Sequence, residues 1–188
     1  MYGEESQDED ERYEIEKREE EKLDTDIYSI LTQFEKTKEW ADLTNCLIKL
    51  NRILSNSSIS HIPYKETICK RLAQCLNHQL PTGVHMRALE VYASILDKTS
   101  PESLSKDLAL FSTGLFPFFS YSSLSVRPQF LEIIDKYYLP LGPKLLPCLI
   151  GLLICILPGL EDEKSETYDM VSRGCRMCYD KGFDKSRC

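Results

Sequence analysis

Apolar residues recur along most of the chain every three to four positions, which is the period of an α-helix. The clearest example is the segment 39–54, where one helical face carries Leu43, Cys46, Leu47, Leu50, Ile53 and Leu54. Comparable patterns occupy residues 63–76, 84–96, 104–111, 127–138 and 144–157. No alternating strand pattern of useful length separates them. The pattern therefore predicts an all-α fold.

Two further helices are expected towards the ends of the chain. Residues 25–36 form a short periodic segment, with Thr25 as the predicted N-cap. Residues 162–182 carry one apolar stripe, made of Tyr168, Val171, Cys175 and Cys178.

Prolines punctuate the helical segments at intervals of 16 to 23 residues, at Pro63, Pro81, Pro101, Pro117, Pro140 and Pro158. Proline is tolerated in a first helical turn but not in a helix interior. Each interval therefore fits one helix and a short turn, and two intervals make a hairpin of about forty residues, the period of HEAT or armadillo repeats. We predict a right-handed α-solenoid of such helical hairpins, with a compact helical bundle as the alternative.

Charge divides the chain into unequal parts. Residues 1–22 hold eleven carboxylates and four bases, so their net charge of −7 equals that of the whole chain. We expect an acidic leader over 1–24, disordered or a frayed helix, then a helical repeat domain over 25–182 and a frayed tail over 183–188. The leader is either a solubilising tail or a lure for a basic partner. The balanced remainder does not indicate nucleic-acid binding.

The most apolar stretch, residues 145–160, leaves only ten residues between Pro147 and Pro158. A membrane-spanning helix needs about twenty residues, so a buried core helix is expected, with any membrane contact peripheral. The eight cysteines follow no secretory signal, and several lie on apolar helical stripes. Free thiols in a reducing, cytosolic setting are the prediction.

Several segments, in order, resemble the N-terminal region of the Dopey family. They read EKTKEWADLTNCLIKLNRIL, KRLAQCL, LPTGVHMRALEVY, LSKDLALFSTGLFPFF, VRPQFLEIIDKYYLPLG and LIGLLICILPGLEDE, and they cover roughly residues 27–165. The leader (1–25) and the last residues (170–188) give no clear match to the family pattern.

The resemblance implies a non-catalytic scaffold that is peripheral on Golgi, trans-Golgi and endosome membranes and acts in endosome-to-Golgi vesicle traffic. The implied partners are a large Golgi scaffold related to Arf exchange factors and, through it, a phospholipid flippase. Kinesin and anionic phosphoinositides are further implied partners, and no cofactor belongs to the pattern. The alternative is a cytosolic protein–protein interaction module that has no contact with lipid.

Cys75, His78 and His85 stand close together in sequence and are residue types that bind metals. Zinc needs four ligands, or three in a catalytic site, and no fourth is obvious here because Cys69 lies about 120° around the helix from Cys75. We therefore predict a structural role: Cys75 in the core, and His85 bonded to backbone at the hairpin turn.

Cys175 and Cys178 form a single C-x2-C pair, with Cys188 beyond it. One such pair without a second pair or a histidine is weak evidence for zinc, so helix packing is favoured over a metal or redox role. The chain has no P-loop, no nucleophile elbow and no H-E-x-x-H motif. A zinc- or thiol-dependent enzyme is a remote alternative.

Basic residues off the apolar stripes should be exposed, and they are candidates for a strip that contacts anionic lipid or an acidic partner: Lys65, Lys70, Arg71, Arg87, Arg127, Lys136 and Lys144. Ordinary solvated helix faces would look the same. Trp40 and Tyr92 are predicted packing residues. Finally, an apolar patch should be exposed on the helix after Pro158, as a face suited to another repeat.

Overall fold

The computed structural model describes residues 4–37, 39–57, 61–161, 163–165 and 167–182, and within them every regular element is helical. The elements are α1 Glu4–Lys36, α2 Trp40–Asn56, α3 Lys65–Cys75, α4 Thr82–Lys98, α5 Pro101–Lys106, α6 Leu108–Leu115, the 3-10 helix η1 Phe116–Tyr121, α7 Arg127–Ile133, the π-turn η2 Ile134–Tyr138, the 3-10 segment η3 Leu139–Cys148, α8 Leu149–Ile156, the 3-10 turn η4 Leu157–Leu160 and α9 Tyr168–Gly182. The predicted all-α class is confirmed.

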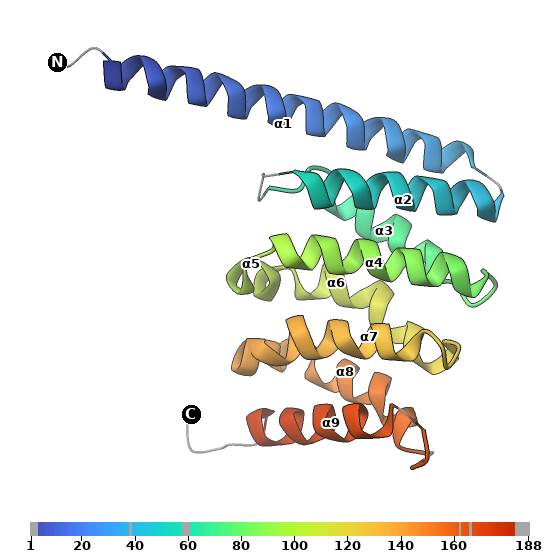
Figure 1. Cartoon of the computed structure of the whole chain (residues 1–188). Coiled ribbons are helices and arrows are strands. Elements are labelled where there is room, and N and C mark those ends of the chain that lie inside the picture. Colours follow the sequence, from blue (N-terminus) through green and yellow to red (C-terminus); the bar gives the residue numbers. More distant parts are fainter. Residues whose placement is uncertain (1–3, 38, 58–60, 162, 166, 183–188) are drawn as a thin grey trace.

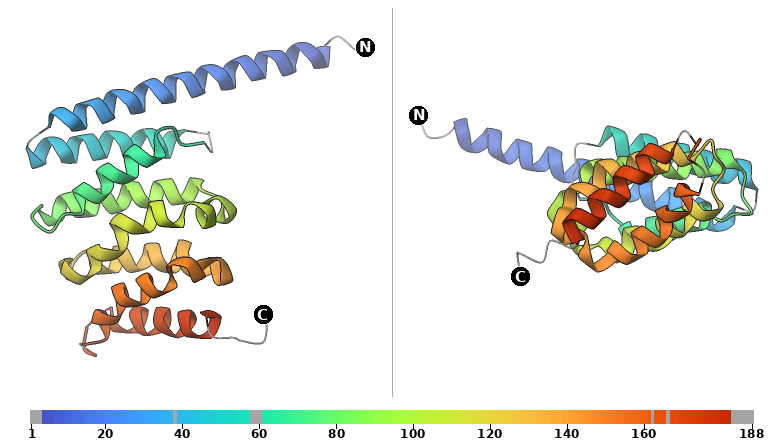
Figure 2. Two further views of the ribbon diagram at one scale, coloured as in Figure 1. Left: turned by 180° about the vertical axis from the view of Figure 1, so that it is seen from behind. Right: turned by 90° about the horizontal axis from the view of Figure 1, so that it is seen from below.

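The helices lie in two layers that alternate along the chain (Figure 1). One layer holds α2, α4, α7 and α9, which run in the same direction. The other holds α3, α6 and α8, which run the opposite way and are in front when the molecule is seen from behind (Figure 2). Packing follows this arrangement, because α2 contacts α4, α4 contacts α7, and α3 contacts α6.

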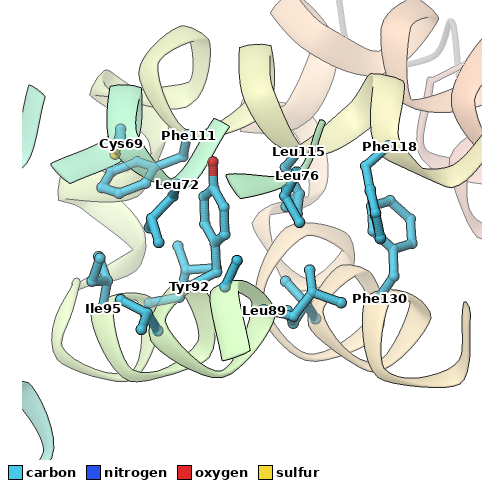
Figure 3. Close-up of a cluster of buried hydrophobic side chains, with 14 of the residues drawn as sticks. Cys69, Leu72, Leu76, Leu89, Tyr92, Ile95, Phe111, Leu115, Phe118 and Phe130 are labelled. Atoms are coloured by element: carbon cyan, nitrogen blue, oxygen red, sulfur yellow. The ribbon is translucent and has the colours of Figure 1, made fainter. Parts of the chain in front are cut away.

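The hydrophobic core lies between the layers and extends along the whole stack. In Figure 3 the Tyr92 ring rises from α4 towards Leu72 on α3 and Phe111 on α6. All three side chains are buried, as are Leu89 and Phe118. The apolar stripes predicted for α2, α3 and α4 therefore face the core, and burial of these side chains is the main stabilising contribution.

Local chemistry explains where several helices begin and end. Pro101 occupies the first turn of α5, and the Ser100 hydroxyl caps this helix by accepting a hydrogen bond from the Ser103 amide at 3.2 Å. Residues 104–111 were expected to form one helix, but Asp107 interrupts them with φ −102° and ψ 18°. Its carboxylate accepts from Lys65 Nζ at 2.6 Å, which ties this junction to α3.

The run Arg127–Leu160 is, by length and composition alone, apolar enough for a membrane span. The fold divides it between the two layers. Gly142 has φ 57° and ψ −125°, a conformation that disfavours any residue with a Cβ, and the chain bends there. One helix was predicted over 144–157, but the regular α-helix begins only at Leu149. Pro147 lacks the amide hydrogen that a longer helix would need.

Helix α1 is longer than the sequence pattern predicted. It is continuous from Glu4 to Lys36, so no break marks the boundary expected at residues 24–25. Thr25 is not an N-cap, since its hydroxyl donates to the Glu21 carbonyl at 2.9 Å inside the helix. In Figure 1 the N-terminal part of α1 continues well past the end of α2. The predicted tail, 183–188, lies outside the described residues.

Several polar contacts between neighbouring segments join residues about forty positions apart in sequence. Tyr64 donates to Asp24, Ser94 to Asn51 and Lys98 to Ser57, which are 40, 43 and 41 residues apart. Tyr137 donates to the Ala93 carbonyl, 44 residues away. This spacing matches the hairpin length of about forty residues that the prolines predicted.

Candidate interaction surfaces

The residues of the suspected ligand cluster point in different directions. Cys75 is buried in the core, and His78 is exposed with its ring against Tyr121 at a centroid distance of 5.9 Å. His85 is buried, its Nε2 lies 2.9 Å from the Asn77 carbonyl oxygen, and its ring meets Phe118 at 5.0 Å. Since a carbonyl oxygen only accepts, Nε2 carries the proton. His85 thus joins the start of α4 to the end of α3, in agreement with the predicted bond to backbone.

Metal ligation finds no support in the described part of the chain, where no three histidine, cysteine or carboxylate side chains come close enough to hold an ion. The buried thiols are also poor nucleophiles. Burial raises the pKa of Cys69, Cys75 and Cys155 to about 12. Burial raises the pKa of the partly exposed Cys175 as well. Cys188 and the Cys178 side chain lie outside the described residues.

These pKa values predict the order in which thiols react. At pH 8 a thiol with a pKa of about 12 is about one ten-thousandth thiolate, and only the thiolate attacks an alkylating agent. We expect iodoacetamide to modify the partly exposed Cys148 and Cys175 at least about tenfold faster than Cys69, Cys75 and Cys155. Peptide mass spectrometry over time measures the rates, and labelling in urea should abolish the differences. Equal rates in the folded chain would contradict the burial.

Most of the predicted basic strip is neutralised by carboxylates. Four residues form ion pairs: Lys65 with Asp107, Arg71 with Glu35, Arg87 with Glu90, and Lys144 with Glu102, at 2.6 to 2.8 Å. Lys136 pairs likewise with Asp97 at 2.7 Å. The hydrogen bond from Lys144 lowers the pKa of Glu102. Four of these five pairs join segments that are far apart in sequence, so local sequence spacing could not identify the partners.

The two remaining candidates behave differently from each other. The Arg127 guanidinium lies over the Phe119 ring, 5.0 Å from its centroid, and belongs to the packing of α7 against η1. Lys70 is exposed on α3, and no contact within the described residues engages its ammonium group. The seven candidates are therefore distributed over α3, α4, α7, η2 and η3, and their net positive charge is small.

Trp40 is not a packing residue, which corrects the prediction made for it. Its side chain is 56% exposed, whereas Cys46, Leu47 and Leu50 on the same helix are fully buried. The first turn of α2 lies at the bend after α1, so its side chains are not enclosed between layers. Tyr92, in contrast, is buried as predicted, and burial raises its pKa.

An exposed apolar stripe follows the outer face of α8. Ile150 and Ile154 are 73% and 67% exposed, and Leu157 continues the stripe at the start of η4. Such a patch was expected on the helix after Pro158, but it lies on the helix before it. The reason is the alternation of layers: α8 is the last described helix of its layer, and it is more apolar than α9. Contiguous exposed apolar side chains are typical of a binding surface.

A second surface, which the sequence pattern did not reveal, is a groove between α1 and α2. Its volume is about 580 Å³. Leu23, Ile30 and Ile53 supply its apolar part. Its polar lining consists of Glu19, Lys22, Asp26, Ser29, Gln33, Lys49, Arg52, Asn56 and Ser57. Short polar residues such as Ser29 look like a solvated helix face in sequence, which is why no pattern indicated a groove.

Comparison with known proteins identifies the family. The family described as "Dopey, N-terminal" matches residues 17–178, which extends the resemblance into both the leader and α9. The chain is 49% identical over 144 residues to mouse "Protein DOP1B", covering 76% of this chain and 6% of that protein. It is 46% identical over 138 residues to the Drosophila melanogaster "Protein DOP1 homolog", covering 73% and 5% respectively.

A more distant relative is "Protein pad-1" of Caenorhabditis elegans, 39% identical over 162 residues, which cover 84% of this chain and 7% of the relative. The chain thus spans only 5 to 7% of the length of these three proteins. No solved structure matches it. The family match over most of the helical stack, together with these identities, shows that the chain belongs to the Dopey family.

Proposed function

We propose that the chain is a non-catalytic scaffold or adaptor domain acting in endosome-to-Golgi vesicle traffic. Membership of the Dopey family is the observation that carries this proposal. The form of the molecule supports it, since a stack of helices in two layers offers long surfaces rather than an enclosed active site (Figure 1).

We further propose that the stack is an α-solenoid of HEAT- or armadillo-like hairpins. The recurring separation of about forty residues between bonded segments supports this arrangement. In such an array each hairpin packs on its neighbours, and binding is distributed over a surface made by several repeats. The stripe of Ile150, Ile154 and Leu157 suits a further helix of the same layer.

The proposed protein partner is a large Golgi scaffold related to Arf exchange factors, through which the chain would reach a phospholipid flippase. Kinesin is a further proposed partner. The proposed location is the cytoplasmic surface of Golgi, trans-Golgi and endosome membranes, where the chain would be peripheral.

Capture of the purified partner scaffold by the immobilised chain tests this function. Saturable binding is the expected result, and it should weaken at least about tenfold in the double variant Ile150→Glu, Ile154→Glu if the α8 stripe contributes to the interface. Ile48→Glu, at an exposed site on α2, is the matched control and should bind like the parent chain. The absence of saturable binding by the parent chain would overturn the proposed partnership.

Direct contact with anionic phosphoinositide is the second candidate, and the unengaged Lys70 is the observation that favours it. Flotation with liposomes containing phosphatidylinositol phosphate should then recover the chain at low salt. Each exposed base contributes about 1 kcal/mol near an anionic leaflet, so Lys70→Glu should lower the bound fraction about fivefold or more. If the chain floats at neither low nor high salt, lipid contact is excluded. The alternative, a protein–protein interaction module without lipid contact, would then remain.

A further inference from the structure

The groove between α1 and α2 has the dimensions of a site for a helix. Its α1 wall extends from Glu19 to Gln33, and at 1.5 Å per residue this is about 21 Å, or nearly four helical turns. The two helices are antiparallel neighbours, and α1 continues past α2 in Figure 1. A third helix of comparable length can therefore lie along the seam between them.

The apolar part of the groove is small and firmly placed. Leu23 and Ile30 are 7% and 6% exposed, so their side chains are held in the core and present only an edge to the groove. Ile53 on α2 is half-buried beside them. An incoming helix with apolar residues at i, i+4 and i+7 would place them against these three side chains, as in other helix-in-groove complexes.

The two walls of the groove differ in net charge. On the α2 wall, Lys49 and Arg52 are exposed cations, and Lys49 Nζ donates to Gln33 Oε1 across the seam at 3.2 Å. The Arg52 guanidinium is not engaged by any hydrogen bond or ion pair within the described residues. The α1 wall carries two carboxylates, Glu19 and Asp26, and one base, Lys22, so its net charge is −1. This asymmetry specifies the charge of each flank of an incoming helix, because complementary potentials determine register and exclude wrong partners.

We propose that this groove binds an amphipathic helix of a protein partner, with carboxylates on the flank that faces Lys49 and Arg52 and bases on the flank that faces Glu19 and Asp26. The proposal rests on the scaffold function and names a docking surface for it. The surface is separate from the α8 stripe, which lies at the other end of the stack (Figure 1).

The probe that tests this proposal is a fluorescent 18-residue helical peptide with leucines at i, i+4, i+7 and i+11, glutamates along one flank and lysines along the other. Its control carries lysines along both flanks. In fluorescence anisotropy we expect the first peptide to bind at least tenfold tighter than the control, because only the control must place lysines against Lys49 and Arg52 in either direction. Equal affinity for the two peptides, or no binding by either, would overturn the proposal.

Variants of the chain confirm the location. Arg52→Glu should reduce the preference between the peptides at least about fivefold. Ser29→Tyr should weaken both peptides by filling the groove from an exposed position of α1. Lys106→Glu is a like charge reversal at an exposed position of α5, outside the groove, and should change nothing. An unchanged preference in Arg52→Glu would exclude the groove as the site.

A second copy of the chain is the rival occupant, and sedimentation analysis distinguishes it. If the parent chain dimerises and Ser29→Tyr abolishes the dimer, the groove is occupied by a second copy of the chain. That result would overturn the proposal of a partner helix. Peptide binding can fail while the parent chain still captures the partner scaffold, in which case the docking site is wrong and the scaffold function stands.

Discussion

Replacing Phe118 with alanine is expected to lower the free energy of unfolding by about 3–5 kcal/mol, the usual cost of truncating a buried phenylalanine. Phe118 is fully buried in η1, and its ring packs against His85 at 5.0 Å and Tyr121 at 5.7 Å. Truncation would leave a cavity where η1 meets the start of α4, and rigid neighbouring helices could close it only in part. Urea unfolding followed by circular dichroism measures the change.

Leu124→Ala is the matched control for that experiment. Leu124 follows η1 but is 71% exposed, so its truncation should change the free energy of unfolding by less than about 0.5 kcal/mol. A loss below about 1 kcal/mol for Phe118→Ala would show that the ring does not occupy a close-packed site.

Gly114→Ala should destabilise the protein by about 2 kcal/mol, although alanine is the better helix former by about 1 kcal/mol. A Cβ at position 114 would lie 2.4 Å from the Ala73 Cβ, 2.9 Å from the Ala73 Cα and 3.1 Å from the Tyr92 hydroxyl. The Cα and Cβ atoms of Ala73 are fixed to the α3 backbone and cannot rotate away. The steric clash can therefore be relieved only if α6 and α3 move apart. Their close approach across the layer depends on glycine.

Gly151→Ala tests the same substitution where space is available. Its Cβ would meet only Phe116 Cδ2, at 3.6 Å, which is an ordinary contact. We expect this variant to gain up to about 1 kcal/mol in the free energy of unfolding. Thermal and urea unfolding of both variants should therefore give changes of opposite sign, and a stabilised Gly114→Ala would contradict the packing of α6 on α3.

The sequence predicted those parts of the fold that depend on local period and on proline. The stripes of α2, α3 and α4, and the place of His85 at a joint, follow from spacing within one or two helices. Length was misjudged for α1, because residues 4–22 are mostly charged and carry no apolar stripe in the sequence. Trp40 was misjudged because helical period gives direction but not whether a neighbour covers the first turn.

The candidate surfaces were harder to predict, because they depend on residues far apart in sequence. Lys144 looked like a free surface base, but Glu102, its partner, comes 42 residues earlier. The α1–α2 groove combines Ser29 and Asp26 with Arg52, none of which is distinctive alone. Only the relative positions of the helices bring these groups together, and those positions are set by core packing rather than by local sequence.

The separation of about forty residues between bonded helices also bears on how the chain acquires its fold. Partners such as Tyr64 and Asp24, or Tyr137 and Ala93, need to close only a loop of this size, and loop-closure entropy rises slowly with length. Contact order, the mean sequence separation of contacting residues relative to chain length, therefore stays low even in a longer chain of this kind. A low contact order favours rapid folding. At a synthesis rate of roughly 5–20 residues per second, a ribosome makes one hairpin in about 2–8 seconds. Each newly made helix can thus dock on the helices before it while the next is still being translated.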